Sequence, residues 1–419
     1  MDLSVFSALE SEVRSYIRSF PVVFDTARGS KIWDEDGTEY IDFFCGAGTL
    51  NYGHNNPAFK QPIIDFLTAD KLQHALDMAT GAKKRFIEAF RDVVLVPRGL
   101  DYKLQFTGPT GANAVEAALK IARQVTGRRN ILTFTHAFHG VSLGALAVTG
   151  NDKFRAAAGI ELPGAVFHPY DGFYGPEVDT VASLRELLDD PGSGVELPAA
   201  VIVETVQGEG GVNVASPEWL QSLERLCRDK GMLLIVDDIQ IGVGRSGDFF
   251  SFEAAGITPD IVTLSKSLSG YGFPLSLVLL KPELDIWKPG AHSGTFRGNN
   301  IAFVGATAAL ETYWADPEFA ASVKRRGEKL RAGLDAIADR YPGAFTTRGR
   351  GLLQGLVGED RAVASAISRE AFSRGLIIET SGPFNEVLKV MPTIVGDDET
   401  LEAGIRIISD AVDAVMAAG

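Results

Sequence analysis

The 419 residues suffice to bury a large core, and the 45% apolar and 22% charged content is typical of a globular protein. The formal net charge of -14 argues against a nucleic-acid-binding surface, which would need a basic stripe. The sequence has two cysteines and no Cys-x-x-Cys motif, which argues against a disulfide framework and a structural metal site. It has no apolar run as long as a membrane helix and no signal-peptide pattern, which argues against a membrane anchor. Together these features favour the cytoplasm.

The N-terminal region is predicted to hold one helix and one hairpin. Apolar residues recur at helical spacing over residues 3–20, and Pro21 ends the pattern. The face expected to be buried carries Val5, Leu9, Val13, Tyr16 and Phe20. Residues 31–44 are predicted to form a hairpin that turns at Asp36-Gly37. The segment 46–57 is rich in glycine and asparagine, which is typical of a binding loop or of an ordinary turn.

From about residue 58, helices alternate with short apolar strands. Helices are predicted at 81–94, 111–126, 180–189 and 217–230. Strands are predicted at 130–134, 199–203, 232–236, 261–264 and 275–280. Because these strands are apolar almost throughout, we expect an α/β fold with a mostly parallel sheet covered by helices on both faces. Catalytic loops should then lie outside the carboxyl ends of the strands.

The last part of the chain is predicted to form a smaller α+β domain. A long helix at 299–314 is expected to leave the large domain, and further helices are expected at 320–340, 360–374 and 398–417. We therefore expect three segments, namely an N-terminal segment 1–57 that packs with the small domain, a large domain 58–315 and the small domain 316–419.

A lysine follows the strand predicted at 261–264. Lys266 stands where the apolar run changes to small polar residues, and a charge there is costly unless it is used or neutralised. A strand-end lysine that extends back to solvent is the ordinary explanation. The alternative is a Schiff-base lysine, whose amine becomes nucleophilic through partial desolvation.

Two acids and a glutamine end the strand predicted at 232–236. At least one of Asp237 and Asp238 is expected at a buried edge with a cationic partner, although an N-cap or a solvated loop remains the alternative. A protonated pyridine nitrogen would supply that cation. The 29 positions from Asp237 to Lys266 allow one crossover to a neighbouring strand, so the two side chains could flank one ring.

Glycine-rich loops supply candidate anion contacts. The loop 106–111 opens a strong helix, whose free amides and dipole would bind an anion unless the helix is simply capped. This loop lacks the Gly-Lys-[Ser/Thr] ending of a nucleotide P-loop. The G-x-G-x-x-G match at 242–247 is rejected as a dinucleotide site because no helix follows it. Residues 294–300 offer a second possible anion contact.

Further acids and an aromatic ring are expected at the same edge of the sheet. Glu204 and Glu209 follow one predicted strand, and Phe138 and His139 follow another. A phenylalanine such as Phe138 is more often a core residue than a cofactor contact, and His139 could equally be a structural histidine. Combined with the lysine and the anion site, these side chains match pyridoxal phosphate better than a nucleotide, a metal ion or a Ser/His/Asp site. Each residue taken alone keeps its structural explanation.

Over nearly its whole length the sequence resembles the class III aminotransferases of PLP fold type I. Residues 236–245 are similar to the motif D-E-V-Q-T-G-x-G-R and residues 263–266 to the lysine signature of that class. Residues 204–211 and 294–299 resemble E-P-x-Q-G-E-G-G and G-T-F-G-G-N. Further stretches, at 9–16, 42–48, 50–57, 108–118, 265–272 and 295–300, are most similar to the diaminobutyrate-forming branch found in ectoine pathways.

The resemblance implies a reaction and roles for its central residues. Aspartate 4-semialdehyde and L-glutamate would be converted into L-2,4-diaminobutyrate and 2-oxoglutarate. Lys266 would form the Schiff base and move the proton, and Asp237 would keep the pyridine nitrogen protonated. Glu209 resembles the acid that helps the site alternate between an ω-amino substrate and glutamate.

Other residues are implied to hold pyridoxal phosphate. Gln240 would contact the ring hydroxyl, while Ile239 and Phe138 would lie on opposite faces of the ring, and Glu204 is placed among the cofactor contacts. The phosphate would be bound by the amides of Gly111 and Ala112 and by Thr295 of a second copy, which implies a homodimer.

Two departures from the class III pattern concern the substrate carboxylate. Lys389 stands where many members carry an arginine, and a lysine binds a carboxylate as a point charge rather than through two parallel hydrogen bonds. Arg297 replaces the usual glycine of the loop at 294–299, and we hypothesise that it supplies or supports a carboxylate clamp. Glu209, Arg297 and Lys389 are therefore the predicted substrate-binding residues.

Three alternative functions remain at this stage. Another class III ω-aminotransferase, acting on ornithine, acetylornithine or 4-aminobutyrate, would have the same cofactor site, as would an aminomutase. A non-catalytic PLP-binding regulator is a remote alternative, because such proteins carry a DNA-binding module that this acidic chain lacks. No metal, nucleic acid or membrane partner is expected.

Overall fold

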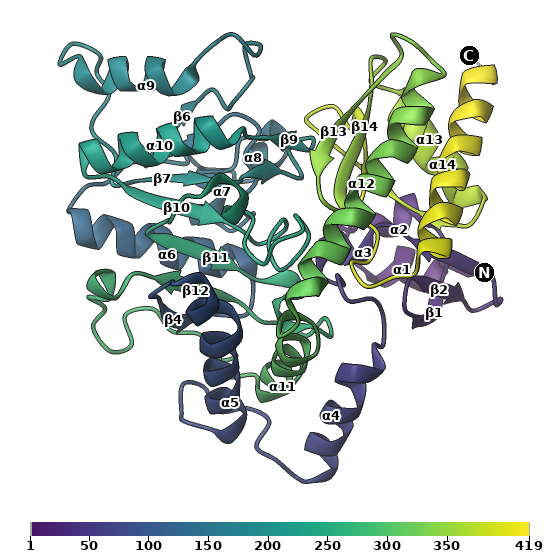
Figure 1. Cartoon of the computed structure of the whole chain (residues 1–419), viewed down its shortest axis with the longest axis horizontal. Helices are drawn as coiled ribbons and strands as arrows, with labels where there is room; N and C mark the ends of the chain where they lie inside the picture. Colours follow the sequence, from purple (N-terminus) through teal and green to yellow (C-terminus); the bar gives the residue numbers. More distant parts are fainter. Residues whose placement is uncertain (1, 419) are drawn as a thin grey trace.

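The computed structural model describes residues 2–418 in two parts (Figure 1). The large part, on the left of the figure, is built on a seven-stranded sheet with the order β4-β12-β11-β10-β7-β5-β6. All neighbours are parallel except β12, which runs antiparallel to β4 and β11. The predicted α/β fold with a mostly parallel sheet is confirmed. The strands are β4 (Lys103–Phe106), β5 (Ile131–Phe134), β6 (Ala165–His168), β7 (Ala200–Val203), β10 (Leu233–Asp237), β11 (Ile261–Leu264) and β12 (Leu277–Leu280).

Strand β7 shows why the apolar runs are continuous. Ala200 and Ile202 belong to the core that includes helix α6 (Gly111–Thr126), whereas Val201 and Val203 belong to the core that includes helix α10 (Pro217–Lys230). Successive side chains of a strand point to opposite faces, so a sheet covered on both faces needs an apolar residue at every position.

Local end signals set the bounds of the two helices that cover β7. The Thr110 side chain accepts a hydrogen bond from the Asn113 amide and caps α6, which ends at Gly127 with a φ of 68°. Ser216 caps α10, and Gly231 ends it with a φ of 57°. Glycine adopts this left-handed conformation without steric cost. The predicted helices 111–126 and 217–230 are confirmed.

The remaining helices of the large part surround these elements. Helices α5 and α11 continue into π-helical turns at Phe90–Leu95 and Leu310–Trp314, which together account for the predicted helices 81–94 and 299–314. Helix α4 and strands β4 and β6 were not predicted. The helices are α4 (Pro57–Thr68), α5 (Gly81–Ala89), α7 (Leu143–Ala147), α8 (Asp152–Ala156), α9 (Thr180–Asp189) and α11 (Asn300–Ala309).

The small part joins the two ends of the chain, and its purple and yellow segments share the right half of Figure 1. Strand β3 (Glu39–Asp42) pairs with β2 (Lys31–Asp34) in the predicted hairpin, and its other edge pairs in parallel with β15 (Leu376–Ile377). A second sheet has the order β13-β14-β17-β16. The other elements are β1 (Phe24–Arg28), β13 (Phe345–Arg350), β14 (Leu353–Gly358), β16 (Glu379–Ser381), β17 (Val387–Val390), α12 (Pro317–Asp339), α13 (Val363–Ser373) and α14 (Asp398–Ala418).

The single helix predicted over residues 3–20 is wrong. The structure has two short helices, α1 (Ser4–Leu9) and α2 (Tyr16–Ser19), and the side chains of Leu9 and Val13 are 83% and 89% exposed. At the end of this segment, Tyr16 and Phe20 pack against the aromatic rings of Phe44 and Phe372. A helical pattern needs an apolar surface to pack on, and a short helix without one is marginal.

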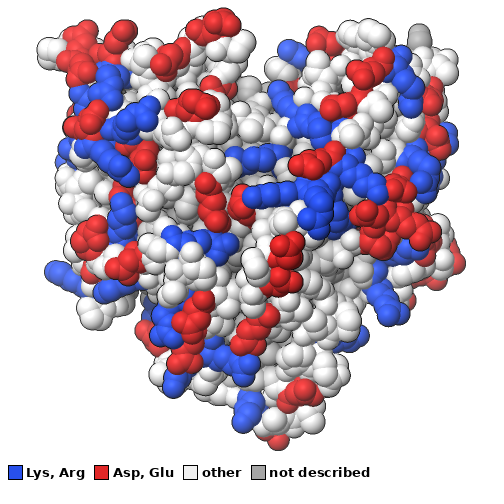
Figure 2. All heavy atoms as spheres, in the orientation of Figure 1, with Lys and Arg blue, Asp and Glu red and all other residues white. Residues whose placement is uncertain are grey.

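The surface carries both signs of charge. Figure 2 shows acidic and basic side chains interspersed on one face, with a notch between the two parts at the top of the view. Over residues 2–418, no helix is both long and apolar enough to cross a membrane.

Candidate active site

The carboxyl ends of three neighbouring parallel strands open onto one cavity of about 190 Å³. Glu204 follows β7, Asp237 ends β10 and Lys266 follows β11, so the topology brings together side chains that are far apart in sequence. Nearly all the predicted cofactor residues line this cavity. The lining consists of Gly111, Ala112, Phe138, His139, Gly140, Glu204, Val206, Glu209, Asp237, Ile239, Gln240, Ile241 and Lys266.

Lys266 lies in the cavity rather than extending to bulk solvent. Its Nζ donates a hydrogen bond to the Ala47 carbonyl over 2.8 Å, and burial lowers the pKa of its ammonium group. The backbone of Lys266 has a φ of 49°, an uncommon conformation for a residue with a side chain. Ala47 lies in the loop for which a binding role and an ordinary turn were both considered. Burial therefore shifts the protonation equilibrium of the Lys266 amine toward its nucleophilic, neutral form.

The Asp237 carboxylate is held from both sides. Its Oδ2 accepts from Nδ1 of His139 over 2.7 Å, and its Oδ1 accepts from the Thr263 hydroxyl over 3.0 Å. An ionised carboxylate only accepts, so Nδ1 of His139 carries the hydrogen. His139 Nε2 is buried and has no hydrogen-bond partner among residues 2–418. The sequence pattern indicated that Asp237 needs a cationic partner, but not that His139 binds it.

Asp238 points away from the cavity although it is equally buried. Its Oδ2 accepts from the Ser251 amide over 3.0 Å, and burial raises the pKa of its carboxyl group to about 7. The structure therefore separates the two acids of the strand end, with Asp237 lining the cavity and Asp238 facing the protein interior.

Glu204 adds a third acid close to Asp237. Burial and the charge of Asp237 raise the pKa of Glu204 well above its usual value. Glu204 Oε1 accepts from the Phe138 amide over 2.8 Å, which fixes the backbone beside the Phe138 ring.

The start of α6 forms the opposite wall of the cavity. The first amides of a helix have no partner within it, and here they belong to Gly111 and Ala112. A Cβ atom on Gly111 would lie 2.9 Å from Ile239, and one on Gly140 would lie 2.7 Å from Ala112. Both glycines therefore let neighbouring side chains pack closely beside this helix N-terminus, whose free amides are a suitable place for an anion.

Glu209 links the cavity to the small part of the molecule. Its Oε1 accepts from Lys389 Nζ over 2.6 Å and from Gln240 Nε2 over 3.0 Å. Burial would raise the pKa of Glu209, but the charges of Lys389 and Lys266 outweigh it and leave that pKa at about 2. Lys389 itself is fully buried and does not line the cavity.

Thr295 and Arg297 lie away from the cavity of their own chain. The Thr295 carbonyl accepts from His74 over 2.6 Å, and the Arg297 guanidinium pairs with Asp77 and donates to the His292 carbonyl over 3.1 Å. Within one chain the structure brings together Glu209 and Lys389, but not Arg297 with either of them. Sequence reasoning missed Glu379, whose Oε1 lies 2.9 Å from Lys389 Nζ, because no motif marks it.

Similarity to known proteins identifies the family of this chain. Residues 14–412 match the aminotransferase class-III family. A Bordetella parapertussis protein named diaminobutyrate–2-oxoglutarate transaminase is 62% identical over 414 residues, which cover 98% of this chain and 95% of that protein. Proteins of the same name from Nocardia farcinica and Halalkalibacterium halodurans are 57% and 54% identical, over 99% of this chain and 95% and 97% of theirs.

Solved structures share the fold over the whole chain. Ornithine aminotransferase from Toxoplasma gondii ME49 superposes with a TM-score of 0.86 at 28% identity, covering 99% of this chain and 95% of that one. Another structure of the T. gondii enzyme has PLP at partial occupancy in its active site. It superposes with a TM-score of 0.85 at 28% identity, covering 99% of this chain and 94% of that one. An S-selective transaminase from Bacillus megaterium has a TM-score of 0.87 at 22% identity, covering 99% and 97%.

Proposed function

This chain belongs to the class-III aminotransferases, and we propose that within the family it transfers the amino group of L-glutamate to the aldehyde carbon of L-aspartate 4-semialdehyde. The products are 2-oxoglutarate and L-2,4-diaminobutyrate. The observation that carries this proposal is the match, over nearly the whole chain, to proteins named diaminobutyrate–2-oxoglutarate transaminase. The charges around the cavity, described above, support a site for small charged amino acids.

The enzyme uses pyridoxal phosphate, and the cavity fits it. The first amides of α6, which have no partner within the helix, suit the phosphate, and the Asp237 carboxylate suits a protonated ring nitrogen. Lys266 reaches the same cavity. When bound, pyridoxal phosphate supplies an electron sink for the electron pair released as the substrate C–H bond breaks.

Each group then has a role that its surroundings support. Burial lowers the pKa of the Lys266 amine, which suits it to take up and return the proton of the substrate carbon. Asp237 would hold the ring N–H through its negative charge, and His139 and Thr263 orient the Asp237 carboxylate. Phe138, Ile239, Gln240 and Glu204 also line the cavity and would surround the ring.

The substrate assignment is tested by measuring kcat/KM with a panel of amino donors. With 2-oxoglutarate as acceptor, we expect 2,4-diaminobutyrate to exceed ornithine, acetylornithine and 4-aminobutyrate by at least about 100-fold, because one or two misplaced groups cost a few kcal/mol in a fitted site. Formation of diaminobutyrate from aspartate semialdehyde and glutamate is the direct check. A higher kcat/KM with any competing donor would contradict the assignment.

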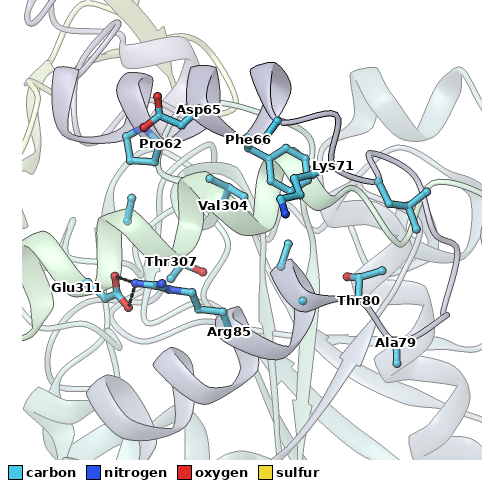
Figure 3. Close-up of a pocket in the computed structure, with 15 residues that line it drawn as sticks. Pro62, Asp65, Phe66, Lys71, Ala79, Thr80, Arg85, Val304, Thr307 and Glu311 are labelled. Carbon is cyan, nitrogen blue, oxygen red and sulfur yellow. Dashed lines mark hydrogen bonds and ion pairs between the residues drawn. The ribbon is translucent and has the colours of Figure 1, made fainter.

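We further propose that the enzyme is a homodimer. A groove of about 820 Å³, larger than the cavity at the strand ends, lies between α4, α5 and α11 (Figure 3). Exposed apolar side chains cluster in the same stretch of chain, namely Ile64, Leu67, Leu72, Leu76, Met78 and Ile87. An apolar area of this kind is typical of a protein interface.

The same surface is bonded to the loop that carries Thr295 and Arg297. The Ala75 amide donates to the Gly298 carbonyl over 3.2 Å, and His74 and Asp77 bind Thr295 and Arg297 as described above. If a second copy covers the apolar surface, both side chains lie at the interface. This arrangement supports the proposal that they act on the partner's phosphate and substrate carboxylate.

Mixing two inactive variants tests this contribution between subunits. Lys266→Ala and Arg297→Ala are each expected to be inactive, but in a mixed dimer one cavity has Lys266 from one chain and Arg297 from the other. Random exchange should therefore restore about a quarter of wild-type activity. No recovery, with mixed dimers verified by two affinity tags, would show that Arg297 acts in its own chain, and an Arg297→Ala variant that is active by itself would show that Arg297 has no such role.

Two further proposals concern organisation and location. The pairing of β3 with β15 supports the packing of residues 1–57 with the small domain 316–419, beside a large domain 58–315. Cys45 and Cys227 are both free and buried, which supports a reducing compartment such as the cytoplasm.

A further inference from the structure

The loop that precedes α4 holds a hydrogen-bond acceptor against the lysine of the cavity. The Ala47 carbonyl accepts from Lys266 Nζ over 2.8 Å and from Gln240 Nε2 over 3.0 Å. A carbonyl oxygen has two lone pairs, so these two donors use both of them. Because Lys266 and Gln240 line the cavity, the Ala47 carbonyl lies at its wall.

The backbone brings this carbonyl to the cavity in an unfavourable conformation. Residues 45–48 have φ values of 49°, 57°, 56° and 88°, which make one left-handed turn. Gly46 and Gly48 adopt such values freely, but Cys45 and Ala47 carry side chains that disfavour a positive φ. A turn of this kind persists only where its surroundings impose it.

The Asp42 carboxylate fixes the start of this turn. Its Oδ1 accepts from the amides of Phe44 over 2.9 Å and Cys45 over 2.8 Å, and its Oδ2 pairs with His54 Nε2 over 2.7 Å. Asp42 is buried at the end of β3, which lies between β2 and β15 in the small part. It does not line the cavity, so its effect on Lys266 passes through the turn.

The position of the Lys266 amine matters most while the amine is free. During that part of the transamination the amine moves the proton of the substrate carbon. A lysine side chain is flexible, and an amine that is not held spends less time within reach of that carbon. An amine that donates one N–H to the Ala47 carbonyl stays in the cavity and keeps its lone pair for the proton.

We propose that Asp42 is a positioning residue that holds the Ala47 carbonyl where it binds the free amine of Lys266 during proton transfer. The inference goes beyond the proposed function, because it applies to whichever amino donor the enzyme uses. It joins the two parts of the molecule, since Asp42 belongs to a sheet of the small part and Lys266 follows a strand of the large one.

The kinetic test replaces Asp42 in the holoenzyme. Asp42→Ala removes the acceptor of the Phe44 and Cys45 amides, so kcat should fall about 30-fold, while the KM for glutamate changes less than about threefold. Asp42→Asn keeps an oxygen that accepts from both amides and should retain at least about a third of wild-type kcat. A rise in KM without a loss of kcat in Asp42→Ala would overturn the proposal.

Asp34→Ala is the matched control for loss of a buried carboxylate. Asp34 ends β2 of the same sheet, and its Oδ1 accepts from the amides of Asp36 over 3.1 Å and Thr38 over 2.9 Å. The turn that it holds lies in the hairpin and does not line the cavity. Both alanine variants lose two buried hydrogen bonds, but Asp34→Ala should keep kcat within about threefold of the wild type. An equal loss of kcat in the two variants would contradict a specific role of Asp42.

Chemical labelling of Lys266 gives a readout that does not depend on activity. The full-length protein, freed of cofactor, is treated with acetic anhydride, and acetylation of each lysine is measured by mass spectrometry. A hydrogen-bond acceptor favours the protonated amine, so its loss in Asp42→Ala should raise the labelling rate of Lys266 at least about threefold. Lys389 is completely buried and serves as the internal standard, because unfolding would raise its labelling as well.

Gly46→Val is a second variant that acts on the turn without removing a buried charge. A Cβ atom at Gly46 would lie 3.6 Å from its nearest neighbours, so there is room for it, but a β-branched residue disfavours the φ of 57°. Gly46→Val should lower kcat and raise Lys266 labelling in the same direction as Asp42→Ala. Unchanged Lys266 labelling in both variants, or labelling of Lys266 and Lys389 that rises in parallel, would overturn the proposal.

Discussion

Replacing Lys266 by alanine is expected to lower kcat/KM for glutamate and aspartate semialdehyde by at least about 10⁴-fold. The substitution removes both the amine that binds the cofactor covalently and the base that moves the substrate proton, and each of these roles alone is worth orders of magnitude. The visible absorption band of lysine-bound pyridoxal phosphate should disappear as well. Stopped-time product assays and an absorption spectrum of the purified variant are the measurements.

Lys281→Ala is the matched control for this experiment. Lys281 follows β12 on the same sheet and forms an ion pair with Asp260 at 2.6 Å, but it does not line the cavity. We expect its activity to stay within about threefold of the wild type, since partly exposed ion pairs contribute little. If the Lys266→Ala variant kept more than about a tenth of wild-type activity, the central role proposed for Lys266 would be contradicted.

Asp237→Asn is expected to lower kcat by about 10²- to 10³-fold and to weaken retention of pyridoxal phosphate. The variant keeps the shape and the acceptor for His139, but it loses the negative charge that stabilises a protonated ring nitrogen. A ring without that proton is a poorer electron sink. Half-reaction rates with glutamate, together with the fraction of cofactor left after dialysis, measure both effects.

The neighbouring acid offers a control at almost the same place. Asp238 has the same residue type at the same strand end and is fully buried, but it faces Ser251 and not the cavity. Since burial raises the pKa of Asp238 to about 7, its charge is already partly lost near neutral pH. Asp238→Asn should therefore leave kcat within about threefold of the wild type. Equal losses in the two variants would indicate disruption of the strand end rather than loss of a specific charge.

Asp237 and Asp238 are neighbours in sequence, but only Asp237 lines the cavity. Both lie at the carboxyl end of β10, and only alternation along the chain places one toward the cavity. His139, in the loop after β5, and Thr263, on β11, then hold Asp237 from two other segments of the chain. A ring nitrogen would meet a carboxylate whose orientation is already set, so little reorganisation is needed when it is bound.

The sequence alone determined most of the elements and the edge of the sheet at which the site lies. Helices such as 111–126 carry their own caps and apolar spacing, and strands such as 261–264 carry continuous apolar runs, so both follow from neighbouring residues. The polar residues that follow these strands, among them Glu204, Asp237 and Lys266, then had to meet because parallel strands end at one edge. The resemblance to class III aminotransferases added the cofactor and the reaction.

Only the tertiary structure decided which side chains touch. His139 and Asp237 are 98 positions apart, and the contact of Glu379 with Lys389 depends on strand register. Neither contact leaves a pattern among neighbouring residues of the sequence. The exposure of Leu9 and Val13 likewise depends on whether another element covers them. Local spacing encodes the elements, whereas the partners of a buried charge depend on how distant elements pack, because Coulomb and hydrogen-bond energies act over a few ångströms in space and not along the chain.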